Sequence, residues 1–145
     1  VRRRHSLLIG ESTAERVKTK IGSAMEDSDH RQMQIKGRDV TEGMSRSIVI
    51  GSDEIYVAIN DALQRIVRAI RETLENTPPE LSADIFERGM VIAGGGALLR
   101  DMDRRLMQET GLPVVVAEDP LTCVARGCGR ALEEIAVLGD VFASE

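Results

Sequence analysis

Aromatic residues are scarce in this chain, which has two phenylalanines, one tyrosine and no tryptophan among its 145 residues. A hydrophobic core must therefore be built from aliphatic side chains. Proteins that bind single-stranded nucleic acid stack the bases on aromatic rings, and a net charge of −5 is a poor match for a phosphate backbone. The composition therefore predicts no nucleic acid partner, and the basic run at residues 2–5 is interpreted as a solvated helix end.

Cysteines and long apolar runs are also few. Cys123 and Cys128 are too few for a disulfide framework, and their spacing puts them on different sides of a helix rather than around one metal ion. No apolar run approaches the roughly 18 residues that a membrane-spanning helix needs, and no secretory signal follows the charged start. These features favour a cytoplasmic protein.

The sequence also lacks a recognisable set of catalytic residues. We recognise no Ser-His-Asp set, no convergent pair of carboxylates and no metal-ligand cluster in the sequence. We therefore expect neither a catalytic residue nor a metal ligand in this chain.

The first part of the chain combines a helix with a hairpin. Ser12 and Glu15 have the spacing of a capping box, which predicts a helix that starts there and ends at Gly22. Alternating residues at 31–40 predict a strand, and a β-branched run then predicts its antiparallel partner. Residues 11–50 are thus typical of a small α+β insertion.

A long helix and a short one follow. Ser52 is a suitable N-cap for a helix of about six turns, because apolar residues recur at helical spacing up to Leu74. The Pro78-Pro79 pair ends it. A short helix is expected from about residue 80 to residue 87.

The last part alternates between strands and helices. Apolar runs at 89–93 and 114–116 are typical of strands buried on both faces, and each precedes a helical pattern. Such strands should be parallel neighbours in an α/β unit. The last helix is expected to begin at Asp119 and Pro120. Its periodic apolar residues predict a buried stripe made of Leu121, Val124, Ala125, Cys128, Leu132 and Ile135.

Three consecutive glycines, Gly94, Gly95 and Gly96, lie between the first of these strands and the next helix. Ligands bind at this edge of open α/β sheets, and glycine lets the main chain approach a flat or anionic group. The run is neither a Walker A loop nor a G-x-G-x-x-G motif, because Leu99 holds the last place. From the residues alone, a nucleotide contact and a plain tight turn are equally well supported.

Glu15 and Lys18 are three residues apart and share a helix face. A carboxylate can accept hydrogen bonds from ribose hydroxyls, and a lysine stem can cover a ring. The capping box and an exposed ion pair explain the same two residues without any ligand. The residues alone favour this second interpretation.

The order of these segments resembles the C-terminal portion of the MreB family of bacterial actin homologues. The runs that carry the resemblance are LIGESTAERVKTKIG, PPELSADIFERGMVIAGGGALLRDMDRRLMQETGLPVVVAEDPLTCVARG and GRALE, and it extends over nearly the whole chain. The resemblance implies an α/β fold, the second domain of an actin-like ATPase of the ribonuclease H-like class. It divides the chain into a helix end from the large subdomain at 1–10, a small inserted subdomain at 11–47, and the large subdomain at 48–145.

The resemblance also implies an ATP site, with Mg²⁺ accompanying the nucleotide in the whole protein. Two segments would form this chain's side of the site. The sugar and α-phosphate would lie against Gly94, Gly95, Gly96 and Ala97, with Leu98 adjacent. The adenine and ribose would be bordered by Glu15, Arg16, Val17 and Lys18.

In that family the parts that clasp the phosphates, organise Mg²⁺, activate water and reach the membrane all precede the residue that matches Val1. We therefore expect a fragment that carries half of the nucleotide site and hydrolyses no ATP alone, since phosphoryl transfer depends on positioning by those parts. The resemblance implies a protein that self-associates into filaments at the inner face of the plasma membrane. It would set rod shape by organising the cell-wall elongation machinery.

Two alternatives remain open from the sequence. One is an enzyme of the sugar-kinase branch of the same fold, which predicts substrate-binding acids in the inserted subdomain. Residues 23–47 do contain acidic side chains, but they are scattered through loops. The other is an interaction module that uses the fold without a nucleotide.

Overall fold

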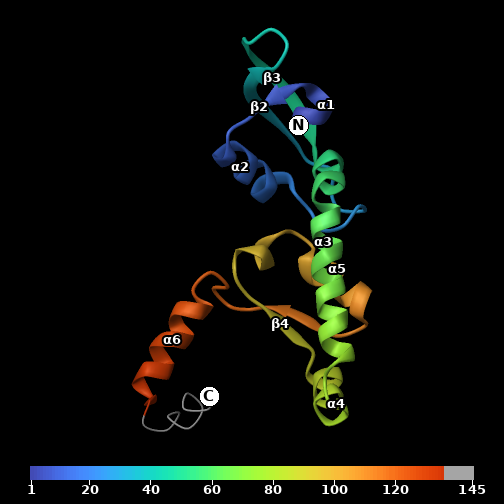
Figure 1. Cartoon of the computed structure of the whole chain (residues 1–145), viewed down its shortest axis with the longest axis vertical. Helices are drawn as coiled ribbons and strands as arrows, with labels where there is room; N and C mark the ends of the chain where they lie inside the picture. The colour runs from blue at the N-terminus through green and yellow to red at the C-terminus, as the bar shows by residue number, and fades with distance from the viewer. Residues whose placement is uncertain (136–145) are drawn as a thin grey trace.

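The structure, a computed structural model, describes residues 1–135; the last ten residues of the expected subdomain at 48–145 lie outside this range. Two groups of elements are connected by one long helix (Figure 1). In chain order the elements are α1 (Arg2–His5), β1 (Leu7–Leu8), α2 (Glu11–Ile21), β2 (Gln32–Asp39), β3 (Ser45–Gly51), α3 (Ser52–Glu75), α4 (Pro79–Arg88), β4 (Met90–Ile92), the 3₁₀ helix η1 (Gly95–Leu98), α5 (Met102–Thr110), β5 (Val114–Val116) and α6 (Cys123–Glu133).

The first group is a three-stranded antiparallel sheet in the order β1-β2-β3, with α2 packed against it. Its core is aliphatic, as the composition requires: Ile35 and Ile50 from the hairpin pack with Leu7 and with Val17 of α2, and all four are buried. The predicted hairpin is confirmed. The prediction of a helix end over residues 1–10 is wrong beyond His5, because Leu7 and Leu8 pair with β2 as a strand.

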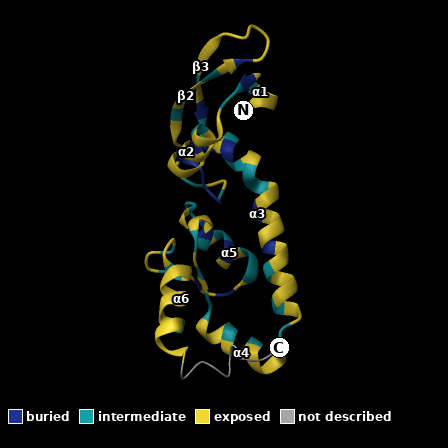
Figure 2. Cartoon of the chain, turned by 60° about the vertical axis from the view of Figure 1, so that its left-hand side comes forward, coloured by how far each residue is buried: buried dark blue, intermediate teal, exposed yellow. Residues whose placement is uncertain are grey.

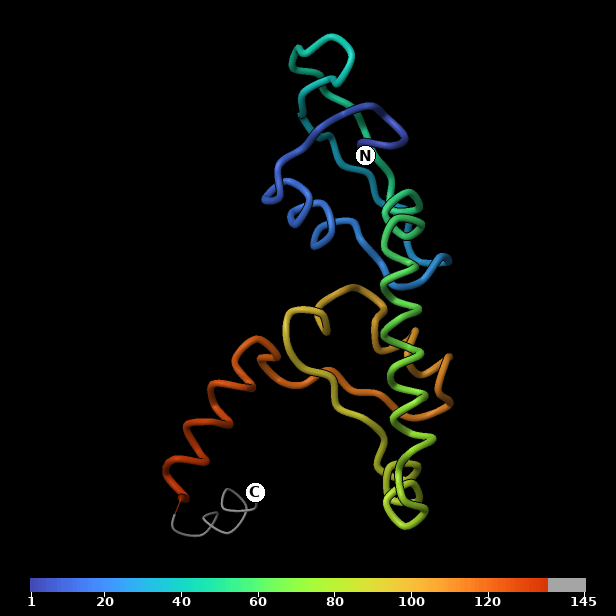
Figure 3. The backbone as a smooth tube through the Cα atoms, viewed as in Figure 1, coloured from blue at the N-terminus to red at the C-terminus, as the bar shows by residue number. Residues whose placement is uncertain are grey.

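Helix α3 is the common support of both groups, and Figure 3 shows its tube running alongside them. Its first turns contribute Ile55 to the core of the first group, whereas Leu63 and Val67 belong to the core of the second. Ile59 packs against both cores. The predicted length of about six turns is confirmed by its 24 residues. No helix within residues 1–135 combines the length and the apolar character that crossing a membrane requires.

The helix starts differ from the predicted caps. Glycines occupy the N-cap positions of α2 and α3, namely Gly10 and Gly51, and Ser12 and Ser52 lie inside the first turns. The hydroxyl of Ser52 accepts a hydrogen bond from the backbone N–H of Arg31 at 3.1 Å, and its own N–H donates to the carbonyl of Arg31 at 2.9 Å. A long-range contact therefore occupies the side chain that was expected to cap the helix.

The second group contains the predicted strand–helix–strand unit. Strands β4 and β5 are parallel, with Met90 beside Val114, and α5 connects them. The prediction that both strands are buried on both faces is wrong here, because Val91 and Val115 are 70% and 57% exposed.

The predicted buried stripe of the last helix is wrong too. Within the part of the chain that the structure describes, α6 has no buried residue, and Figure 2 colours most of it as exposed. The helix also begins later than predicted. Asp119 lies in a turn at φ +47°, and α6 starts at Cys123 after Thr122. No side-chain hydrogen bond caps it among the described residues.

The glycine run leads into a short 3₁₀ helix rather than directly into the predicted α-helix. Helix α5 begins only at Met102, after Asp101 in the left-handed conformation at φ +59°. Gly111 ends α5 at φ +73°, as its position in the sequence predicted.

Candidate functional site

A cavity of about 280 Å³ lies between α2 and the glycine turn. Segments far apart in the sequence meet there, because α2 forms one wall and η1 with the start of α5 forms the other. Apolar side chains dominate the lining, and one carboxylate and one ammonium group stand at its edge. The lining residues are Glu15, Lys18, Thr19, Leu63, Ile66, Gly95, Gly96, Leu98, Leu99, Met102 and Leu121.

Five of the nine predicted site residues line this cavity: Glu15, Lys18, Gly95, Gly96 and Leu98. The other four, which are Arg16, Val17, Gly94 and Ala97, lie outside the lining. Val17 is in the core of the first group, and Ala97 is buried in the turn. Gly94 donates a hydrogen bond of 2.7 Å to the carbonyl of Pro120, which ties the turn to the connection before α6.

Glu15 and Lys18 share a helix face, as predicted, and form an ion pair of 2.8 Å between Oε2 and Nζ. The capping-box explanation for Glu15 is wrong, because α2 starts at Glu11 after Gly10. Exposed pairs of this kind contribute at most about 1 kcal/mol. Both side chains can therefore exchange this contact for a ligand at small cost.

The three glycines are not equivalent. Gly94 adopts φ +79° and ψ 177°, a conformation that favours glycine, so a tight turn explains this residue. Gly95 and Gly96 are not among the glycines with positive φ. A Cβ at Gly95 would make an ordinary contact of 3.5 Å with Leu121. Within residues 1–135, a Cβ at Gly96 would meet no atom within 4 Å beyond its chain neighbours and the backbone of its own helix. Neither backbone conformation nor packing within the described chain explains these two glycines, which both line the cavity.

Apart from Leu98, the apolar part of the lining was not predicted as a site. Leu63 and Ile66 lie in the helix predicted from the apolar spacing that ends at Leu74, and Met102 lies in the helical pattern predicted after the glycine run. Leu121 was assigned to the stripe of the last helix. Periodicity identifies a face that turns away from solvent, but it does not say whether protein or a ligand covers that face.

A larger apolar groove of about 490 Å³ lies between the second half of α3, α4 and β4. Its polar lining side chains are those of Thr73 and Thr77, and among residues 1–135 no charged or titratable side chain lines it. The smaller cavity beside the glycine turn is the better candidate site because it combines apolar walls with charged groups and open main chain.

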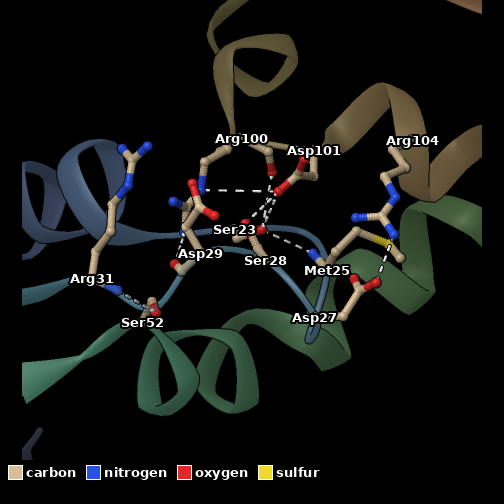
Figure 4. A network of polar contacts seen from close by, with 10 residues as sticks. All are labelled: Ser23, Met25, Asp27, Ser28, Asp29, Arg31, Ser52, Arg100, Asp101 and Arg104. Atoms are coloured by element: carbon tan, nitrogen blue, oxygen red, sulfur yellow. Dashed lines mark hydrogen bonds and ion pairs between the residues drawn. The ribbon is translucent and has the colours of Figure 1, made fainter.

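A polar cluster adjoins this cavity (Figure 4). Oδ2 of Asp101 accepts hydrogen bonds from the hydroxyls of Ser28 at 2.6 Å and Ser23 at 2.9 Å. The Ser28 hydroxyl above all lowers the pKa of Asp101, and Ser23 and the nearby arginines add to this effect against the opposing effect of burial. Asp101 therefore stays ionised at neutral pH.

Metal-binding residues do not cluster in the described part of the chain, where no group of three or more His, Cys, Asp or Glu side chains could hold an ion. Cys123 and Cys128 are both free thiols.

The fold places the chain in the actin-like class of α/β proteins. It matches the crystal structure of MreB5 of Spiroplasma citri bound to AMPPNP with a TM-score of 0.87 and 39% sequence identity, over 93% of this chain and 40% of that one. The MamK double helical filament matches with a TM-score of 0.68 at 22% identity, over 92% of this chain and 41% of that one, which shows the fold alone.

The chain belongs to the MreB/Mbl protein family, whose model matches residues 1–140. It is 56% identical over its whole length to the cell shape-determining protein MreB of Escherichia coli K12, and 45% identical over 93% of its length to the cell shape-determining protein Mbl of Bacillus subtilis. It spans about two fifths of these relatives, 42% and 40% respectively. The resemblance inferred from the sequence and the actin-like fold class are confirmed.

Proposed function

We propose that this chain is part of an ATP-dependent cytoskeletal protein that forms filaments and determines cell shape, and that it supplies one side of the nucleotide site. Relatives at about 50% identity are cell shape-determining proteins, and the similar MreB5 structures contain AMPPNP or ADP. These likenesses support the role, and the cavity beside the glycine turn supports the location of the nucleotide.

The observation that carries the proposal is the meeting of Glu15 and Lys18 with Gly95 and Gly96 around one cavity. Glu15 accepts hydrogen bonds from the ribose hydroxyls, and the stem of Lys18 covers one face of the base. The bare main chain at the two glycines lets the sugar approach closely. At about 280 Å³ the cavity is just under the common range of ligand pockets, which suits a base and sugar rather than a whole triphosphate.

The predicted residues outside the lining have supporting roles in this proposal. Val17 anchors α2 in the core, so that Glu15 and Lys18 keep their orientation, and Ala97 anchors the turn. Arg16, which is exposed, borders the site without lining the cavity. The hydrogen bond from Gly94 to Pro120 fixes the position of the glycine turn beside the cavity.

In the whole protein, other segments hold the phosphates and the accompanying Mg²⁺ and carry out hydrolysis. Self-association into filaments is proposed to use head-to-tail contacts, which repeat without closing a ring. The filaments are proposed to organise the cell-wall elongation machinery at the inner face of the plasma membrane.

The site is tested by measuring ATP affinity in the full natural polypeptide that contains this chain. Lys18→Ala removes the side chain over the base, and Gly95→Val fills the cavity. Each substitution should weaken ATP binding at least about tenfold, or about 1.4 kcal/mol. Lys20→Ala is the matched control, because Lys20 is an exposed lysine of the same helix outside the lining. Unchanged ATP affinity in both Lys18→Ala and Gly95→Val would rule out this location of the nucleotide site.

A further inference from the structure

The connection between α2 and β2 is fastened to the segment between η1 and α5. As described above, Oδ2 of Asp101 accepts hydrogen bonds from Ser23 and Ser28, which are 78 and 73 residues away in sequence. Nη2 of Arg100 reaches the carbonyl of Asp29 at 3.2 Å. Two consecutive residues thus hold both ends of the loop at 23–29, as Figure 4 shows.

The main chain takes part in the same fastening. Ser23 and Arg100 form a parallel β-bridge, and the N–H of Ala24 donates to the carbonyl of Arg100 at 2.8 Å. The N–H of Met25 donates to the Ser23 hydroxyl at 3.1 Å. Ser23 and Ala24 are buried, so this contact lies inside the protein, where hydrogen bonds are costly to break.

Both sides of this fastening border the candidate site. Ser23 follows α2 at a distance of two residues, and α2 carries Lys18 on the cavity wall. Arg100 directly follows Leu99, which lines the opposite wall. Gly22 packs so closely that a Cβ there would lie 3.3 Å from Cδ1 of Leu99.

We propose that Asp101 is a positioning residue, whose carboxylate clamps the segment at 23–28 and thereby sets the spacing between the two walls of the cavity. The proposal rests on the proposed nucleotide site, because it assigns the clamp a role in that site. Asp101 is not one of the lining residues and acts through the orientation of α2.

The carboxylate, rather than the backbone conformation, is the group that does this. Asp101 has φ +59°, a conformation that glycine adopts freely and that asparagine also tolerates. Two hydroxyls donating to one carboxylate oxygen are charge-assisted hydrogen bonds, which are stronger than neutral ones. Asp101→Gly therefore removes the carboxylate and still allows the same backbone conformation. Asp101→Asn keeps a side-chain oxygen that can accept the hydrogen bonds.

An ion pair between the same loop and helix α5 provides the matched control. Nη2 of Arg104 lies 2.6 Å from Oδ2 of Asp27, and both side chains are at least half exposed. An exposed pair of this kind contributes little. Arg104→Ala therefore changes the local charge without removing the part-buried hydrogen bonds to Asp101.

The spacing is measured without a nucleotide by pulsed electron paramagnetic resonance in the full natural polypeptide. Spin labels are placed at Lys20→Cys on α2 and Gln108→Cys on α5, both exposed, after Cys123 and Cys128 are changed to serine. The parent and Arg104→Ala should show one narrow distance distribution, and Asp101→Gly should broaden it. Asp101→Asn should restore most of the narrow distribution. If Asp101→Gly does not fold, Ser28→Ala removes one hydrogen bond and should broaden the distribution less.

ATP affinity is measured in the same variants without labels. Asp101→Gly should weaken binding about tenfold, mainly through faster dissociation, and Asp101→Asn should recover most of the loss. An unchanged distance distribution, or a broadened one with unchanged affinity, overturns the proposal. If the parent binds no ATP, the proposed nucleotide site fails, while the distance measurement still decides whether Asp101 sets the spacing.

Discussion

His5 joins the start of the chain to the first turn of α3, with its Nε2 2.6 Å from Oε2 of Glu54. The guanidinium of Arg4 lies 3.6 Å from the same oxygen. The hydrogen bond from His5 is the main cause that lowers the pKa of Glu54 from its usual 4.5, and the charges of His5 and Arg4 add to it against partial burial. Since only Ser6 separates His5 from β1, this contact helps to hold the edge strand in place.

The first prediction concerns the acid stability that Glu54 provides. A carboxylate whose pKa is lowered by folding stabilises the folded state above its unfolded pKa, and this stabilisation is lost as the pH falls through the folded pKa. We expect Glu54→Gln to cost about 1 kcal/mol at neutral pH. The difference from the parent should shrink as the pH falls below about 4.5. Denaturant unfolding between pH 7 and pH 3 measures this, and a difference that stays constant with pH would contradict it.

The second prediction tests the core of the hairpin group. Ile50 is 1% exposed and Val49, its neighbour on β3, is 58% exposed. Ile50→Ala should lower the free energy of unfolding by about 3 kcal/mol, because it leaves a cavity in an aliphatic core. Val49→Ala is the control on the opposite face of the same strand and should cost less than about 1 kcal/mol. Equal losses in chemical denaturation would show that the described core does not stabilise this group.

The third prediction compares two glycines with positive φ. Gly89 precedes β4 with φ 76° and ψ −161°, a region that only glycine normally enters. A Cβ there would also collide with the backbone of Pro113. Gly111 has φ 73° and no neighbour within 4 Å of its Cβ position among the described residues. Gly89→Ala should therefore cost more than about 2 kcal/mol and Gly111→Ala about 1 kcal/mol in thermal or chemical unfolding. A larger loss of stability in Gly111→Ala than in Gly89→Ala would contradict this interpretation.

Much of the fold could be predicted from local patterns. Helical spacing predicted α3 and its end before Pro79, and alternation predicted the hairpin of β2 and β3. The pattern of α6 shows the limit of this reasoning. Spacing identifies an apolar face, but the face is exposed in the described chain, because which residues cover a helix depends on contacts that periodicity does not contain.

The candidate site could be predicted in part for the same reason. The glycine run stands out in the sequence, and two of its three residues, Gly95 and Gly96, line the cavity. Glu15 and Lys18 also line it, but only the family resemblance had assigned them to the site. The clamp at Asp101 had no local signal, since its hydrogen-bond partners lie more than 70 residues away. The prediction that Ser52 caps α3 was wrong for a related reason. Its hydroxyl accepts a hydrogen bond from the N–H of Arg31, a residue outside the helix.

The fourth prediction concerns how the proposed site recognises the sugar. If the carboxylate of Glu15 accepts hydrogen bonds from ribose hydroxyls, Glu15→Ala should weaken ATP binding about tenfold, as the loss of a hydrogen bond with one charged partner does. The same substitution should leave the weaker binding of 2′,3′-dideoxy-ATP nearly unchanged, because that ligand offers no hydroxyl to the carboxylate. Glu11→Ala, on the first turn of the same helix and outside the cavity lining, is the charge-matched control. Calorimetric titration of both ligands gives the comparison, and an equal loss for both would show that Glu15 acts on the site through charge or helix stability rather than through the ribose.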